Sequence, residues 1–176
     1  MSTVYILLGA QGSGKTTWAK ANASRLEALI LASDDVRNEL ESTGAGDPND
    51  GDLVFHIVEE ELNWLASQGK TVIVDATHAR RKWRKNHIAI ARRHGARVVG
   101  LWFDAPLELC LARNAARPGG AWGDRVVPEE MVRWVWQGFE KPEVGEFDEV
   151  WKIGSIGFGR LPESMSPDNP MRSGGR

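Results

Sequence analysis

The stretch GAQGSGKTTW, residues 9–18, decides the fold of this chain. It follows a short apolar run, residues 3–8, that reads as a buried strand, and it leads into a predicted helix at 15–26. A strand, a glycine-rich loop and a helix in this order are the setting of a phosphate-binding loop. The full pattern G-x-x-x-x-G-K-[ST] is present, in Gly9, Gly14, Lys15 and Thr16.

Each part of this loop has a physical role in holding a nucleotide. The glycines let backbone N–H groups turn inward around phosphate oxygens, and the following helix adds its positive end. We expect Lys15 to bridge the β and γ phosphates and Thr16 to ligate Mg²⁺. The sequence therefore predicts ATP as the donor, with Mg²⁺, at a loop made of Gly9, Gln11, Gly12, Ser13, Gly14, Lys15, Thr16 and Thr17.

Outward from the loop, strand and helix patterns alternate along the chain. Strands are predicted at 3–8, 28–32, 71–75, 97–103 and within 147–154. Helices are predicted at 15–26, 33–40, 52–67, 79–94, 106–117 and 128–140. This alternation predicts a single α/β domain with about five parallel strands and helices on both faces. We place the domain at 1–159, with a helical and glycine-rich lid at about 113–127 and a polar, disordered tail at 160–176.

The bulk properties exclude several classes of protein. A chain of 176 residues is enough for one domain with a real core. There is no run of 18 apolar residues and no pattern of a secretory signal, so we expect no membrane partner. The single cysteine, Cys110, excludes an internal disulfide and fits a reducing cytoplasm. The oligomeric state is left open.

Charge is unevenly distributed along the chain, although the net charge is only −2. Residues 34–61 carry ten acids and one base, whereas residues 80–97 carry eight bases and no acid. Such a run is usually a solvated helix face, and the alternative is a surface that holds a polyanion. Trp83 in the run and Trp122 in the lid are candidates for stacking a base. Core positions are predicted for Trp18, Trp64, Trp102 and Trp151.

Several kinds of phosphate chemistry use such a loop, and the rest of the chain favours phosphoryl transfer. A GTP switch needs an N-K-x-D stretch, which this sequence lacks. A motor ATPase needs coupled domains, for which this length leaves no room. A kinase needs an acceptor site, a base for the acceptor hydroxyl and a cationic lid, and all of these have candidates here.

The candidates for the acceptor side follow two predicted strands. Asp34 can take the proton of an attacking hydroxyl, and the alternative is that Ser33 or Asp34 only caps a helix. Arg37, one helical turn further on, can hold an anionic group of the acceptor. Asp75 ends the strand at 71–75, where an acid acts on Mg²⁺ or on a neighbouring arginine.

The candidates for the cationic lid are two arginines. Arg113 and Arg117 lie four apart, on one face of a predicted helix, and a glycine-rich segment follows them. An arginine delivered from such a lid can neutralise the charge that develops on the transferred phosphoryl group. The alternative is a pair of solvated helix arginines.

The segments GAQGSGKTTWAK, SDDVR, VIVDATH, ARNAARP and VPEEMV, in this order, resemble the kinase domain of 5′-hydroxyl polynucleotide kinases over roughly residues 3–151. The resemblance implies that Asp34 is the general base, Arg37 contacts the acceptor phosphate and Arg117 lies at the γ phosphate. It implies a nucleic-acid partner, the 5′-OH end of DNA or RNA, as acceptor. The other implied positions are Arg113 in the lid and, on the acceptor side, Asp75 and Thr77.

The chain departs from this family's pattern in two places. His78 follows D-A-T where the family often has asparagine, and the segment between Arg117 and Pro128 is longer than usual. A longer aromatic lid suits a flipped base, so a kinase of a hydroxymethylated pyrimidine within DNA is one alternative. A small-molecule kinase for a nucleoside, sugar or antibiotic is another. A non-enzymatic ATP-dependent binding module is the last.

Overall fold

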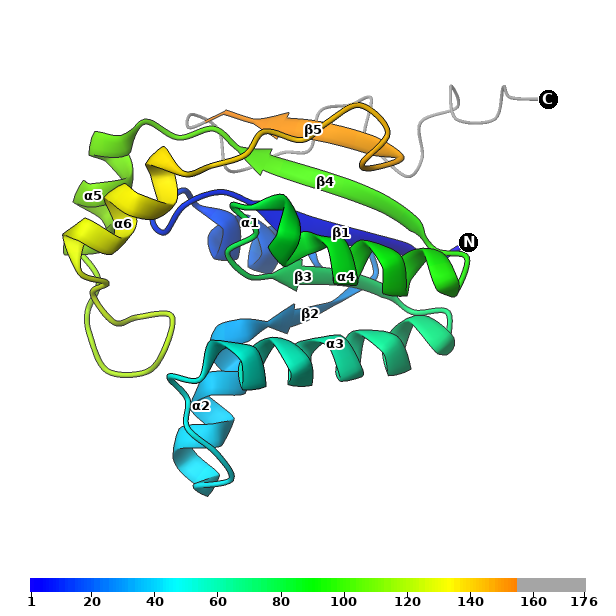
Figure 1. The fold of residues 1–176 in the computed structure, drawn as a ribbon, viewed down its shortest axis with the longest axis horizontal. Helices are drawn as coiled ribbons and strands as arrows, with labels where there is room; N and C mark the ends of the chain where they lie inside the picture. The colour runs from blue at the N-terminus through cyan, green and yellow to red at the C-terminus, as the bar shows by residue number, and fades with distance from the viewer. Residues whose placement is uncertain (155–176) are drawn as a thin grey trace.

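The computed structural model describes residues 1–154 and places five parallel strands in one sheet (Figure 1). The strands are β1 Thr3–Leu8, β2 Ala28–Ala32, β3 Thr71–Asp75, β4 Arg97–Phe103 and β5 Glu149–Ile153. Their order in the sheet is β2-β3-β1-β4-β5, so the strand that leads into the phosphate-binding loop is central. The predicted α/β fold is confirmed. The predicted boundary near 159 and the predicted tail at 160–176 lie outside the described residues.

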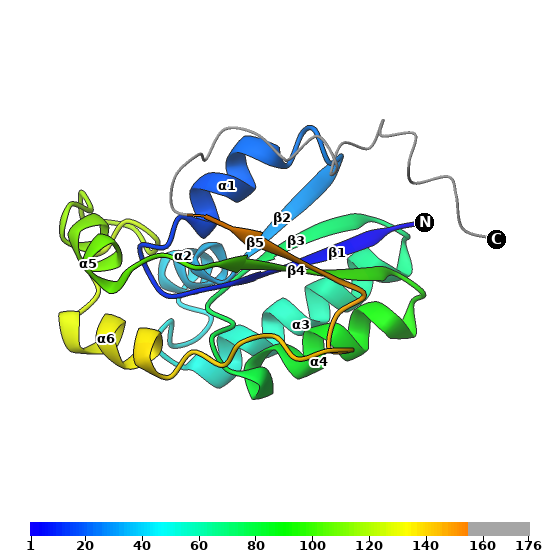
Figure 2. The same cartoon turned by 90° about the horizontal axis from the view of Figure 1, so that it is seen from above.

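Helices cover both faces of the sheet, as predicted (Figure 2). They are α1 Lys15–Asn22, α2 Ser33–Thr43, α3 Gly51–Ser67, α4 Arg81–Arg93, α5 Leu107–Ala115 and α6 Glu129–Gln137. The first, α1, lies on one face, while α3 and α4 lie side by side on the other. The short helices α2, α5 and α6 gather at the carboxyl ends of the strands, the edge at which parallel sheets bind ligands.

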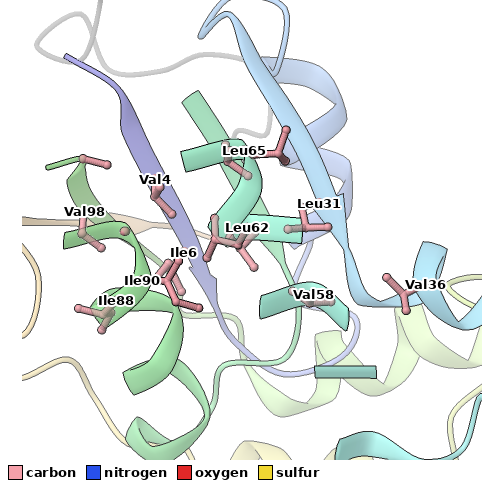
Figure 3. Packing of buried hydrophobic residues seen from close by; sticks show 14 of the residues in the cluster. Val4, Ile6, Leu31, Val36, Val58, Leu62, Leu65, Ile88, Ile90 and Val98 are labelled. Carbon is pink, nitrogen blue, oxygen red and sulfur yellow. The ribbon is translucent and has the colours of Figure 1, made fainter. Parts of the chain in front are cut away.

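The core has one apolar layer on each face of the sheet because alternate residues of a strand point to opposite sides. Tyr5 and Leu7 of β1 face α1, where they join Trp18 in one buried cluster. Val4, Ile6 and Leu8 of β1 face α3 and α4 and belong to the larger cluster (Figure 3). Its labelled members are Val4, Ile6, Leu31, Val36, Val58, Leu62, Leu65, Ile88, Ile90 and Val98.

Local predictions fail at two helix ends. The N-cap of α2 is Ala32, with no side-chain cap bond, so the alternative in which Ser33 or Asp34 caps this helix is wrong. Both side chains belong to the first turn of α2 instead, which leaves the Asp34 carboxylate available for chemistry. The first helix ends at Asn22 rather than near residue 26. Turns follow it, and the chain reverses at Glu27, whose φ of 50° is left-handed, where the N–H of Ala28 donates to the carbonyl oxygen of Ala23.

The prediction that Trp64 is a core residue is also wrong. Its side chain is 62% exposed on α3. The helix buries its opposite face, with Val58, Leu62 and Leu65, against the sheet, and this leaves Trp64 on the solvent side. Trp18 and Trp151 are buried as predicted, and Trp102 is partly buried.

The basic run at 80–97 is neither uniformly solvated nor uniformly available to a polyanion. Half of its basic residues form ion pairs with acidic residues at 140–149, the segment that leads from α6 into β5. The pairs are Arg81–Glu143, Arg84–Glu146, Arg92–Asp148 and Arg97–Glu149. Arg84 is fully buried, so this part of the run is structural.

Candidate active site

The phosphate-binding loop is a narrow cradle of backbone between β1 and α1. Gly12 has φ 76°, and a Cβ on it would lie 2.3 Å from the carbonyl oxygen of Cys110. No side chain fits there, so only glycine allows this approach of the loop to α5. Gly14 is in the left-handed conformation, with φ 100°, and is the N-cap of α1. The unpaired N–H groups of the first turn of α1 therefore face the loop.

Lys15 lies within the cradle. Its ammonium donates 2.8 Å hydrogen bonds to the carbonyl oxygens of Gly9 and Ala10. Burial lowers the pKa of Lys15, while the charge of Asp75 acts in the opposite direction. An ammonium held by backbone at the mouth of an anion-binding loop is placed to meet phosphate oxygens.

Thr16 and Asp75 form the part of the site that fits a magnesium ion. The Thr16 hydroxyl, in the first turn of α1, donates a 2.6 Å hydrogen bond to Oδ2 of Asp75 at the end of β3. Hydroxyl and carboxylate oxygens are the ligands that Mg²⁺ prefers, together with waters and phosphates. A bound Mg²⁺ would neutralise charge on the phosphates. Within residues 1–154 no group of three or more His, Cys, Asp and Glu could hold a metal, so this site would depend on the nucleotide for further ligands.

Two further polar atoms of the loop lack a partner among the described residues. The Ser13 hydroxyl and Gln11 Oε1 are buried without a hydrogen bond. Buried polar atoms are normally paired, so an unpaired hydroxyl in this cradle fits a phosphate-bearing ligand. Thr17, predicted beside them, is exposed on the first turn of α1.

Asp34 lies in the first turn of α2, at the carboxyl end of β2. Burial raises the pKa of Asp34, and the negative charge of Asp75 raises it further. The positive charges of Arg37, Arg117 and Lys15 oppose this shift. Asp34 therefore lies within electrostatic reach of four other predicted site residues, and a carboxylate with a raised pKa suits a general base.

The predicted arginines reach the site from two directions. Arg113, on α5, donates a 3.5 Å bond to the carbonyl oxygen of Gly12 in the loop. Arg117, just after α5, donates 3.1 Å to the carbonyl oxygen of Arg125 and acts on the pKa values of both Lys15 and Asp34.

Arg37 comes from the other side, on α2. It donates to the carbonyl oxygen of Pro48 in the α2–α3 loop. Thr77, predicted on the acceptor side, is partly buried in the turn after β3. Within the part of the chain that the structure describes, Thr77 makes no hydrogen bond or ion pair with the other predicted residues, so its role stays a prediction.

The lid, which connects α5 to α6, is folded over this site. Its base is fixed by Asn114, whose amide group pairs with the backbone of Val127 in both directions, at 2.7 and 3.1 Å. Its tip reaches α2, where a Cβ on Gly123 would lie 3.5 Å from Oδ2 of Asp34. The backbone of the lid thus lies directly against the candidate base.

Sequence reasoning missed three residues of this lid contact: Asn38, Glu41 and Gly123. Asn38 bonds to Trp122, and Glu41 bonds to Arg125, in each case 84 positions along the chain. No local pattern signals a contact of that separation. The predicted lid range, about 113–127, does include the segment that makes this contact, with Trp122 in it.

A parallel sheet with this loop, a strand-end carboxylate and an arginine-bearing lid defines the class of P-loop kinases. A sugar kinase from Janibacter sp. HTCC2649 shares the fold, with a TM-score of 0.64 and 19% identity over 88% of this chain and 86% of that one. A sequence model of the family described as AAA domain matches residues 4–142, and the chain belongs to that family.

Two curated relatives are similar in sequence. The thermosensitive gluconokinase of Escherichia coli (strain K12) is 27% identical over 153 residues, which cover 83% of this chain and 76% of that protein. The L-seryl-tRNA(Sec) kinase of Methanococcus maripaludis is 25% identical over 148 residues, which cover 79% of this chain and 53% of that protein. The chain thus spans about half the length of the second relative. Among residues 1–154, no helix is long and apolar enough to cross a membrane.

Proposed function

We propose that this chain is an ATP-dependent kinase that phosphorylates a hydroxyl of a small acceptor bearing an anionic group. The observation that carries the proposal is the position of Asp34, which is electrostatically coupled to Lys15 and Arg117 and covered by the lid at Gly123. The acceptor oxygen bonds to the γ phosphorus, the bond from that phosphorus to ADP breaks, and the hydroxyl proton passes to Asp34. Lys15 and Arg117 neutralise charge on the transferred group.

The position of the lid favours a small acceptor. The lid tip contacts α2 on both sides of the candidate acceptor residue Arg37, through Gly123 at Asp34 and through Arg125 at Glu41. An acceptor between α2 and the lid is enclosed, which suits a small molecule. Similarity to a gluconokinase supports a polyol acid such as gluconate, whose carboxylate matches Arg37.

A second candidate acceptor is the 5′-OH end of DNA or RNA, and one surface favours it. Near the start of α4, Arg80 lies 4.9 Å from the ring centre of Trp134, which is half exposed, and Lys82 lies 5.9 Å from that of Trp83. Basic side chains next to exposed aromatic rings are typical of proteins that bind single-stranded nucleic acid. A hydroxymethylated pyrimidine within DNA would use the same surface. Against both stands the neutralisation of half of the basic run by acids.

The test is transfer of labelled γ phosphate from Mg·ATP to gluconate and to a 5′-OH oligonucleotide. An Asp34→Asn variant and a 5′-phosphorylated copy of the strand serve as controls. Label on gluconate that is lost in the variant supports the first proposal, and its rate changes little with salt. Label on the 5′-OH strand alone, falling steeply with salt, supports the second. ATP binding without transfer to gluconate, other sugar acids or either DNA strand would leave an ATP-binding module.

A further inference from the structure

The lid tip and α2 are fastened to each other by a set of contacts that we name the α2–lid clasp. It consists of Arg37, Asn38 and Glu41 on α2 and of Trp122 and Arg125 in the lid. Asn38 Oδ1 accepts from the backbone N–H of Trp122 at 2.8 Å, and Asn38 Nδ2 donates to the carbonyl oxygen of Trp122 at 3.2 Å. Arg125 donates to both carboxylate oxygens of Glu41, at 2.8 and 2.7 Å.

The centre of the clasp is the indole of Trp122, which two guanidinium groups contact. Arg37 lies 5.0 Å from its ring centre, and Arg125 lies 4.5 Å from it. Each distance is within the range of a cation–π interaction. Arg125 is neutralised by Glu41, whereas among the described residues Arg37 is bonded only to a carbonyl oxygen, that of Pro48. Arg37 therefore has no carboxylate in ion-pair contact among the described residues, and it acts on the charge of Asp34, one helical turn away, only at longer range.

The geometry of a guanidinium lets Arg37 do two things at once. Its central carbon lies over the indole of Trp122, 5.0 Å from the ring centre, and a guanidinium carries five N–H donors in a planar fork. Only one of these groups, at Nη1, donates to a described residue. The remaining edge can bind a carboxylate or phosphate without leaving the ring.

We propose that Trp122 is a positioning residue that selects anionic acceptors by holding Arg37, so that lid docking and acceptor binding are one coupled event. The proposal rests on the proposed function for its choice of acceptor. Trp122 acts through Arg37 and need not touch the reacting atoms. Coupling between two binding events is reciprocal. If docking of the lid strengthens binding of an anionic acceptor to Arg37 by some factor, the bound acceptor favours the docked lid by the same factor.

The kinetic test is a double-mutant cycle on Arg37→Gln and Trp122→Ala, with gluconate and its uncharged amide as acceptors. Trp122→Ala should raise KM for gluconate about tenfold, as the loss of a partly desolvated cation–π contact implies, with KM for ATP changed less than twofold. The preference for gluconate over the amide should fall by the same factor. In the Arg37→Gln background, Trp122→Ala should add nothing further.

Trp122→Phe is the matched control because it keeps a smaller aromatic face and loses no hydrogen bond, since the indole N–H has no partner among the described residues. It should retain the preference for the anion. Independent, additive effects of the two substitutions, or equal losses for gluconate and the amide, would overturn the proposal.

A second measurement does not depend on turnover. Hydrogen exchange at the backbone N–H of Trp122 reports lid docking, since this group is bonded to Asn38. Arg37→Gln should speed this exchange severalfold in the ligand-free protein, whereas Arg93→Gln, on the exposed end of α4, should not. Unchanged exchange in Arg37→Gln would overturn the coupling even if the protein is an active kinase. Faster exchange without any transfer would retain the clasp and reject the proposed function.

Discussion

At the scale of single residues, the environment of Asp34 decides what its carboxylate can do. Burial and Asp75 push its pKa upward, and Arg37, Arg117 and Lys15 push it downward. The protonation of the candidate base therefore depends on neighbours that have other roles in the site. Changing one neighbour should alter the pH dependence of the reaction as well as its rate.

Arg37→Gln removes one of the charges that oppose the raised pKa of Asp34. The pKa should rise further, so a larger share of Asp34 is protonated at a given acidic pH. The acidic limb of kcat/KM should then move to higher pH, as a profile of acceptor phosphorylation between pH 4.5 and 8 would reveal. Arg37→Lys keeps the charge and should leave the limb in place. A limb that moves to lower pH would reject Asp34 as the base.

Gly12→Ala tests the cradle. Its Cβ would collide with the Cys110 carbonyl, and φ 76° adds strain, of the order of 1–3 kcal/mol for a non-glycine residue. ATP affinity, measured by calorimetry, should fall more than tenfold because the loop must move. Gly44→Ala is the matched control, since Gly44 has φ 68° but open space around its Cβ position. It should cost stability and leave ATP affinity unchanged, and equal affinity losses would contradict this reading.

At the scale of elements, the sequence predicts the strands and the phosphate-binding loop well because their signals are local. The strands β1 to β4 coincide with the predicted ranges, since each is a short apolar run between turn residues. The ion pairs of α4 with residues 140–149 and the contacts of the lid with α2 join segments far apart in the chain. Hydrophobic periodicity carries no information on such pairs, so the sequence could not distinguish the buried Arg84 from its solvated neighbours.

Arg84 holds α4 to the segment that leads into β5. Its guanidinium donates to Glu146 and to the carbonyl oxygens of His78 and Glu140, at 3.1 and 3.0 Å. Arg84→Met should lower the free energy of unfolding by about 3–5 kcal/mol, because the largely buried Glu146 loses its ion-pair partner and the carbonyl oxygens of His78 and Glu140 lose a donor. Arg81→Met, which removes the exposed pair with Glu143, should cost less than about 1 kcal/mol. Urea unfolding of both variants checks this, and equal losses would contradict a structural role for Arg84.

At the scale of the whole molecule, two buried histidines beneath the candidate site affect how the stability of the fold depends on pH. His78 and His87 lie between the sheet, α3 and α4, with His78 Nε2 3.1 Å from His87 Nδ1. His78 Nδ1 is 3.0 Å from the carbonyl oxygen of Leu7, the penultimate residue of β1. These histidines therefore link β1 and α4, on which the phosphate-binding loop and the Arg84 contacts depend.

Burial, followed by the neighbouring His87, holds the pKa of His78 well below 6.5, and burial lowers the pKa of His87. The unfolded chain thus binds more protons than the folded one below pH 6.5. The contribution of the two neutral histidines to the free energy of unfolding should be complete above about pH 6.5. It should be lost as pH decreases, by up to about 1.4 kcal/mol per pH unit for each histidine.

The measurement is urea unfolding at intervals from pH 7.5 to 5.5, compared with His87→Leu, which removes one of the two titrating groups. The slope of the variant should be about half as steep, whatever its absolute stability. Asp34 and Glu61 act in the opposite sense because their pKa values are raised, but they are common to both proteins and cancel in the difference. Identical slopes would mean that His87 takes up a proton in the folded protein as readily as in the unfolded chain.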